Sequence, residues 1–134
     1  NFPAMTVFEN ILVAVEQGVY RKSSSWSPHI NKASCIERTE ELIRSVKLID
    51  QSFLFASDLT RYEQRCLEIA RGLAMDPRIL LVDEPADGMN TQQQHALADL
   101  LKEVCKGALT LVVTSAGSDP FTIICDRTVH LSPH

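Results

Sequence analysis

The sequence predicts an α/β fold in which a helical segment precedes a small, mainly parallel sheet. Two observations support this. Up to about residue 55, apolar residues recur at helical spacing. Beyond it, short apolar runs alternate with amphipathic helical patterns, an order typical of strand–helix–strand units. We therefore expect a single domain over 1–134, with a helical part at 1–55 and a part with about three strands at 56–134.

One helix is expected at the start of the helical part. Thr6 and Glu9 have the spacing of a capping box, and the apolar residues after them predict a helix from Thr6 to Gln17. The polar loop Arg21 to Ala33 follows. Its Trp26 is either an exposed contact residue or a lid that folds back on the helices, and we favour the lid because large aromatic side chains are usually buried.

A second helix is expected to begin at Ser34, because Ser34 and Glu37 repeat the capping-box spacing. It should end near Asp50. Its buried face is expected to carry Ile36, Ile43 and Val46.

The second part of the chain opens with a third capping box, Thr60 with Glu63, which predicts a helix over Arg61–Ala74. A turn leads to the run Ile79–Val82. A run that is apolar on both faces indicates a strand buried within a parallel sheet.

The remaining elements alternate. A helix is expected to be capped at Thr91 with Gln94 and to end at Gly107, with a core stripe formed by Leu97, Leu100, Leu101 and Val104. The segments after it are expected to form a strand at Leu109–Thr114, a short helix within Ser118–Cys125 and a strand at Arg127–Leu131.

Two adjacent carboxylates, Asp83 and Glu84, follow the strand at Ile79–Val82. Open α/β sheets bind their ligands at the carboxyl ends of the strands. Two acids at such an edge are costly unless a cation meets them, and Mg²⁺ with its waters is the usual partner. The pattern is a Walker B motif, in which the Asp holds the metal's water shell and the Glu orients the attacking water.

The segment from Leu59 to Asn90, LTRYEQRCLEIARGLAMDPRILLVDEPADGMN, resembles the ATP-binding subunits of ABC transporters, and most closely their branched-chain amino acid importer branch. The opening stretch Phe2 to Ala14, FPAMTVFENILVA, is similar to the same branch. The resemblance covers nearly the whole chain, in order. It implies a partial P-loop NTPase core of the ABC ATPase kind, preceded by a helical subdomain that docks on membrane subunits.

The resemblance also implies roles for individual residues. Asp83 falls at the position that holds Mg²⁺ through water, and Glu84 at the general-base position. Asn90 lies in the D-loop. The signature motif falls on six consecutive residues: Leu59, Thr60, Arg61, Tyr62, Glu63 and Gln64.

Several parts of the ATPase site are missing or altered. The chain contains no G-x-x-x-x-G-K-[ST] phosphate loop. Tyr62 stands where the family has the glycine that lets helix N–H groups approach a phosphate, so we expect its ring to fill that space. Stacking of Tyr62 on an adenine is the alternative. The switch-histidine position falls at Ala116, or at Ser115 if the alignment slips by one residue.

Composition excludes some classes of function. The net charge of −4, with 22% charged and 45% apolar residues, gives no basic surface for nucleic acid, and no apolar run can span a bilayer. Glu9 interrupts the first apolar stretch, so we expect no signal peptide. The cysteines are Cys35, Cys66, Cys105 and Cys125. They form no C-x-x-C pair and have no histidine at metal-ligand spacing, so we expect reduced thiols in a cytoplasmic protein. We interpret all four histidines as surface residues: His29, His95, His130 and His134.

The sequence leaves three functional hypotheses. The chain is a truncated, degenerate ABC-type ATP-binding protein that hydrolyses no ATP alone, a non-catalytic interaction module, or half of a split subunit that another chain completes. ATP and Mg²⁺ are the family's ligands, but we expect neither to bind tightly. The expected partners are a transporter membrane subunit, a complementary ATPase half, or a second copy.

We expect a homodimer for a structural reason. In such cores another strand lies between those expected here at Leu109–Thr114 and Arg127–Leu131. A gap in its place would leave backbone groups unpaired. Either Arg127–Leu131 moves across to pair with Leu109–Thr114, or a second copy closes the gap, and we favour the second copy.

Overall fold

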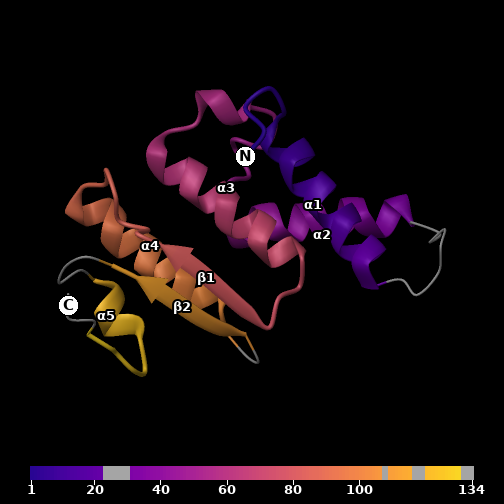
Figure 1. Ribbon diagram of the computed structural model, residues 1–134. Helices are drawn as coiled ribbons and strands as arrows, with labels where there is room; N and C mark the ends of the chain where they lie inside the picture. The colour runs from indigo at the N-terminus through magenta and orange to yellow at the C-terminus, as the bar shows by residue number, and fades with distance from the viewer. Residues whose placement is uncertain (23–30, 107–108, 116–119, 131–134) are drawn as a thin grey trace.

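The computed structural model describes residues 1–22, 31–106, 109–115 and 120–130. In chain order the elements are α1 (Val7–Lys22), α2 (Lys32–Ser45), the 3₁₀ turn η1 (Ala56–Asp58), α3 (Arg61–Ala74), β1 (Ile79–Asp83), α4 (Thr91–Val104), β2 (Thr110–Thr114) and α5 (Phe121–Ile124). Helices α1, α2 and α3 group at one end of the molecule, and the strands lie with α4 and α5 at the other (Figure 1). The expected α/β class, with a helical part first, is confirmed.

Helices α1, α2 and α3 pack together, and α3 is also in contact with β1. α1 comes close to the end of α3 at Gly18, where a Cβ atom would lie 2.7 Å from the carbonyl oxygen of Ala74. On another side of α3, a Cβ atom at Gly72 would lie 2.8 Å from Cδ1 of Leu80. The two glycines therefore allow α3 to lie close to α1 and to β1.

Asn10 fastens the first residues of the chain to α1. Its side chain is fully buried and accepts a hydrogen bond from the backbone N–H of Phe2 at 2.8 Å. Its amide nitrogen lies within 3.2 Å of three backbone oxygens, those of Phe2, Met5 and Thr6. Thr6 also forms a single antiparallel bridge with Phe55. No strand is formed by the described residues of the segment 6–50, in agreement with the helical part that the sequence predicts.

The capping box at the start of α1 is confirmed: Glu9 N–H donates to Thr6 Oγ1 at 3.2 Å, and Thr6 N–H donates to Glu9 Oε2 at 2.8 Å. The expected end at Gln17 is wrong, because α1 continues to Lys22. Gly18 lies inside α1, where it contacts the backbone of α3, and does not end the helix. The last turn is held by an ion pair between Lys22 and Asp76, which lowers the pKa of the Asp76 carboxyl.

The expected bounds of α2 are also wrong. The side chain of Asn31 caps the helix by accepting from the N–H groups of Ala33 and Ser34, so α2 begins before Ser34. It ends at Ser45 instead of near Asp50, because Lys47 adopts a left-handed φ of 60° that a helix cannot continue through. The buried face is correct at Ile43 and Val46, but Ile36 is exposed. Trp26 lies outside the described residues.

Helix α3 begins and ends where the sequence predicts, and its capping box between Thr60 and Glu63 is present. The capping box of α4 lies one residue earlier than expected. It is formed by Asn90 and Gln93 instead of Thr91 and Gln94. It ends at Val104, before Gly107. Three residues of its predicted core stripe are fully buried, and Val104 is partly buried: the buried three are Leu97, Leu100 and Leu101.

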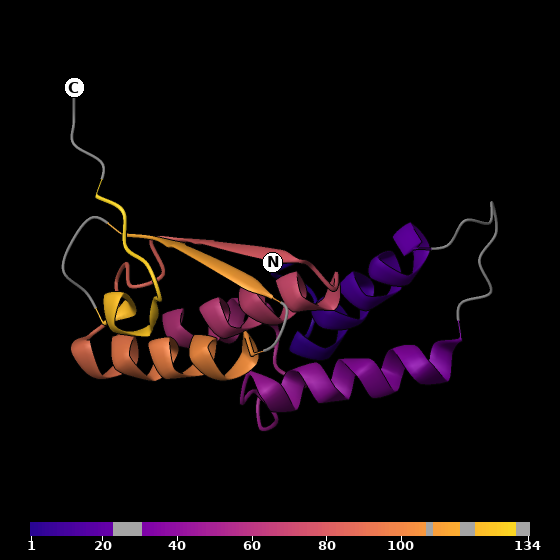
Figure 2. The same cartoon turned by 90° about the horizontal axis from the view of Figure 1, so that it is seen from below.

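β1 and β2 pair in parallel, in a register that sets Asp83 opposite Thr114. A parallel pair needs a crossover, which α4 supplies. One face of the sheet, with Leu80 and Val82, joins the hydrophobic core. The strands form a thin layer above α3 and α4 in Figure 2 and lie in front of α4 in Figure 1.

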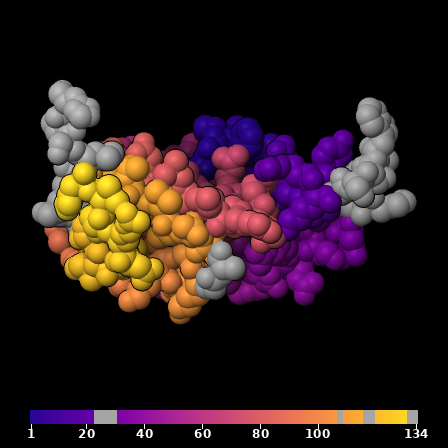
Figure 3. All heavy atoms as spheres, turned by 60° about the horizontal axis from the view of Figure 1, so that its bottom comes forward, coloured from indigo at the N-terminus to yellow at the C-terminus, as the bar shows by residue number. Residues whose placement is uncertain are grey.

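The other face of the sheet is open. Ile79 and Leu81 are each 64% exposed, and Val112 is 41% exposed. The expectation that β1 is buried on both faces is therefore wrong in the described part of the chain, because no described element covers this side. In Figure 3 the region of the strands reaches the surface between the helical part and the C-terminal segment.

The third strand expected at Arg127–Leu131 is not formed. Residues 127–130 are exposed and have no regular secondary structure, and Leu131 lies outside the described residues. A strand requires a neighbouring edge with which to pair, and no described strand pairs with this segment. The short helix expected within Ser118–Cys125 is present as α5, anchored by Phe121, which is 1% exposed.

Replacing Gly18 by Ala tests the contact between α1 and α3. Alanine favours a helix over glycine by about 1 kcal/mol, but its methyl group would meet the Ala74 carbonyl, and a backbone atom cannot rotate away. We expect Gly18→Ala to lower the free energy of unfolding by about 1–3 kcal/mol, the usual cost of overpacking. Urea denaturation measures the change.

Gly72→Ala is the matched control, because the neighbour of its methyl group is the end of the flexible Leu80 side chain. It should be close to neutral. Equal stability of the two variants would contradict the proposed role of Gly18.

Candidate functional site

The acid pair lies at the carboxyl edge of the sheet. Asp83 ends β1, Glu84 follows it, and both are exposed. Thr114, at the end of β2, donates its hydroxyl proton to Oδ1 of Asp83. The Glu84 N–H donates to the Thr114 backbone oxygen at 3.1 Å and lies 3.4 Å from its Oγ1. Both strands thus contribute to this edge.

The loop after Glu84 is tied to α3 by two arginines. Arg61 Nη2 donates to Oδ2 of Asp87 at 2.7 Å, and its Nε donates to the Asp87 backbone oxygen at 3.4 Å. Arg65 Nη2 donates to the Glu84 backbone oxygen at 3.4 Å. Gly88 has a φ of +72°, and a Cβ atom there would lie 3.2 Å from Arg61 Nε. The glycine therefore suits both the backbone turn and the approach of the arginine.

The residues aligned with the signature motif form the start of α3. Leu59 is buried, and its carbonyl accepts from Nε2 of Gln64 at 3.1 Å. Thr60 and Glu63 form the capping box, with Thr60 N–H donating to Glu63 Oε2 at 2.8 Å. The N–H of Glu63 in turn donates a hydrogen bond to Thr60 Oγ1 at 3.4 Å. The helix therefore satisfies this N–H group with its own side chain.

Tyr62 is partly buried and packs against the hydrophobic core. Burial raises the pKa of its phenol to about 12, and the fully buried Cys66, to which it is hydrogen bonded, adds to the shift. Burial also raises the pKa of the Cys66 thiol to about 11. The Tyr62 ring is thus part of the packed structure at the start of α3.

The other predicted site residues are dispersed. Asn90 caps α4 and lies in the loop that follows the acid pair. Ser115 is exposed directly after β2, while Ala116 lies outside the described residues. His95 and His130 are exposed, as expected, and His29 and His134 also lie outside the described part.

The described part of the chain does not offer a complete set of metal ligands. Nowhere in it do three or more His, Cys, Asp or Glu side chains converge. Asp83 and Glu84 fit Mg²⁺, which is commonly held by one or two carboxylates together with waters and substrate phosphates. The two carboxylates alone are therefore a partial site that needs further oxygen ligands.

Three residues that approach the acid pair or its loop were not singled out from sequence for these contacts: Arg61, Arg65 and Thr114. A signal for Thr114 exists, because it ends the strand that pairs with β1 and so must lie at the same edge. The arginine contacts depend on how α3 lies against the loop, which no local pattern encodes.

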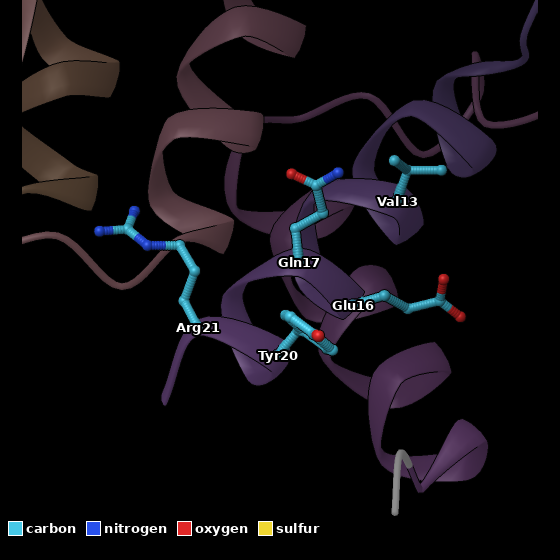
Figure 4. Close-up of a pocket in the computed structure, with 5 residues that line it drawn as sticks. All are labelled: Val13, Glu16, Gln17, Tyr20 and Arg21. Atoms are coloured by element: carbon cyan, nitrogen blue, oxygen red, sulfur yellow. The ribbon is translucent and has the colours of Figure 1, made fainter. Parts of the chain in front are cut away.

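A hollow of about 450 Å³ lies elsewhere, along one side of α1. The described residues that line it all come from α1: Val13, Glu16, Gln17, Tyr20 and Arg21. In Figure 4 the side chains of Glu16 and Arg21 point in opposite directions, with Tyr20 between them. None of the acid-pair residues lines this hollow, and the described part of the chain has no helix long and apolar enough to cross a membrane.

Curated relatives of this chain include ATP-binding proteins of amino acid transport systems. The methionine import ATP-binding protein MetN of Haemophilus ducreyi is 31% identical over 125 residues, covering 92% of this chain and 33% of that protein. The branched-chain amino acid transport ATP-binding protein LivG of Escherichia coli is 34% identical over 110 residues, covering 77% and 42%. The glutamine transport ATP-binding protein GlnQ of Geobacillus stearothermophilus is 28% identical over 130 residues, covering 97% and 50%. No protein-family model matches the chain.

Solved structures share the fold. CbiO1 from Clostridium perfringens, part of the ABC transporter complex CbiONQ, matches 92% of this chain and 45% of its own, with a TM-score of 0.77 and 18% identity. The ADP conformation of MJ1267, an ATP-binding cassette of an ABC transporter, matches 93% and 50%, with a TM-score of 0.74 and 21% identity.

The fold, the acid pair and these matches define the class: the chain is related to the ATP-binding subunits of ABC transporters. The three curated relatives named above are ATP-binding proteins for methionine import, glutamine transport and branched-chain amino acid transport, so the branched-chain branch that residues 59–90 indicate is among them. The chain spans between a third and a half of the length of these three curated relatives.

Stability at alkaline pH tests the burial of Cys66. Its pKa is raised from 9.0 to about 11, so between these values the unfolded chain loses the thiol proton while the folded chain keeps it. The unfolded state then binds fewer protons, and stability falls as the pH rises. We expect a loss of up to about 1.4 kcal/mol per pH unit within this window.

Thermal denaturation under reducing conditions at a series of pH values measures this loss. Cys66→Ala should flatten the decline, whereas Cys125→Ala, which keeps the buried thiol, should retain it. Parallel declines in both variants would contradict the assignment to Cys66.

Proposed function

We propose that this chain, acting alone, is a non-hydrolysing counterpart of an ABC ATP-binding subunit. It combines a helical part at 1–55 with the signature helix and Walker B half at 56–134. In this proposal Asp83 and Glu84 keep the positions of the metal-holding acid and the general base. They lack a phosphate to act on, because the sequence has no phosphate loop.

The observation that carries the proposal is the start of α3. Phosphate binding at a helix N-terminus requires accessible N–H groups. Here Thr60 caps the helix and Tyr62 packs its ring against the core. Arg61 is engaged with Asp87. These contacts support a helix end that serves the chain's own structure and not a nucleotide.

Calorimetric titration of the purified chain with Mg-ATP tests this proposal. We expect no binding with a dissociation constant below about 10 μM, or roughly −7 kcal/mol, because the phosphate-binding parts are absent from the sequence. A non-hydrolysable analogue and Asp83→Ala are the controls. Tight binding that Asp83→Ala abolishes would overturn the proposal.

A split subunit is the alternative that the open sheet face favours. Parallel sheets almost always have both faces covered, yet Ile79 and Leu81 are each 64% exposed here. A separately expressed polypeptide with a Walker A half, added to the same titration, distinguishes the cases. ATP binding that appears only in the mixture would establish the split subunit.

A second copy of the chain is the partner that we propose for this face when the chain is alone. The exposed apolar residues Ile79, Leu81 and Val112 form a surface that two copies can bury against each other. We expect light scattering to report a dimer at high micromolar concentration and Leu81→Asp to shift it to a monomer, because a charge would be buried. Phe53→Asp, on an exposed site in another part of the fold, is the control. A clean wild-type monomer would contradict the proposal.

A transporter membrane subunit is a second proposed partner, and its site would be the helical part. The loop after α2 exposes four large apolar side chains close in sequence to Asp50 and Asp58: Ile49, Phe53, Leu54 and Phe55. Basic, apolar cytoplasmic loops of a membrane protein would complement this composition. Binding of such a loop peptide, and its loss in Phe53→Ser, would test the contact. The free cysteines agree with a cytoplasmic location.

A further inference from the structure

The backbone of Glu84 adopts an unusual conformation for its position. Three non-glycine residues of the described chain have a left-handed φ: Lys47, Asp76 and Glu84. Lys47 and Asp76 each follow the C-cap residue of a helix, where this conformation is common. Glu84, with a φ of 41°, follows a strand. A side chain there is disfavoured unless the surrounding structure enforces the conformation.

Contacts from two distant elements enforce it. The Glu84 N–H is held by Thr114 of β2, through the backbone oxygen at 3.1 Å and Oγ1 at 3.4 Å. The Glu84 carbonyl accepts from Arg65 Nη2 of α3 at 3.4 Å and from the Asp87 N–H at 3.2 Å. Both backbone groups of the residue are therefore fixed from outside.

The guanidinium of Arg65 is itself held in place. Its Nη1 donates to Oε2 of Glu68 at 2.8 Å, and its side chain is only 24% exposed. The Thr114 hydroxyl, meanwhile, donates to the Asp83 carboxylate. One threonine thus contacts both acids of the pair, and one arginine ties the second acid to α3.

The Glu84 carboxylate forms no hydrogen bond or ion pair with any other residue in the described part of the chain, in contrast to its backbone. We propose that Arg65 and Thr114 are positioning residues that hold Glu84 in its left-handed conformation and keep its carboxylate free beside Asp83. The inference rests on the proposed function only for the identity of Glu84 as the retained general-base position.

Amide hydrogen exchange, followed by NMR on the full chain without nucleotide, tests this proposal. In Thr114→Val and in Arg65→Gln we expect the Glu84 and Asp87 amides to exchange at least fivefold faster than in the wild type, with α2 unchanged. Thr114→Ser keeps the hydroxyl and should keep the protection. Arg38→Gln removes an exposed arginine–glutamate pair of α2, far from the loop after β1 in the chain, and should change neither amide.

Glycine substitution supplies a second measurement that does not depend on those variants folding well. Glycine adopts a positive φ without strain, so Glu84→Gly should have a larger folding equilibrium constant than Glu84→Ala, by about fivefold or more. Less than a fivefold effect in either the exchange or the glycine experiment would overturn the proposal. Neither readout uses ATP, so tight nucleotide binding would overturn the proposed function and leave this inference standing.

Discussion

The close packing of α3 against both α1 and β1 is the constraint on which the rest of the structure depends. Gly18 lets α1 approach the backbone of α3, and Gly72 makes room for Leu80 of the strand. With α3 fixed between these elements, its first two turns face the loop after β1, so Arg61 and Arg65 can reach it. Helix packing and the geometry of the acidic edge are therefore parts of one arrangement.

Local patterns predicted the elements whose ends are set locally. The capping box of α3 and the apolar run of β1 gave correct positions because each depends on neighbouring residues. Predictions failed where tertiary contacts decide. Gly18 suggests the end of a helix, but it is buried against α3, and the helix passes through it to pair Lys22 with Asp76. The expected start of α2 is wrong for a local reason, because the helix is capped by Asn31 and not by Ser34.

The candidate site shows the same division. The motif at Asp83 and Glu84 could be found from sequence because it is continuous. The Thr114 hydroxyl and the Arg65 guanidinium act across 31 and 19 residues of chain, so only the paired strands and the packed helix bring them there. The apolar run of β1 likewise could not reveal that one of its faces is open, since composition does not tell which neighbours are present.

The open two-stranded sheet has a consequence for solubility. Exposed strand edges rich in Val, Leu and Ile can recruit identical strands and grow into insoluble fibres, and charged residues at the ends of such runs act as gatekeepers against this. β1 has Arg78 immediately before it and Asp83 as its last residue, both exposed. The Asp83 carboxylate therefore lies at a gatekeeper position, whether or not it also meets a metal. Selection against aggregation would favour an acid at this position independently of nucleotide chemistry.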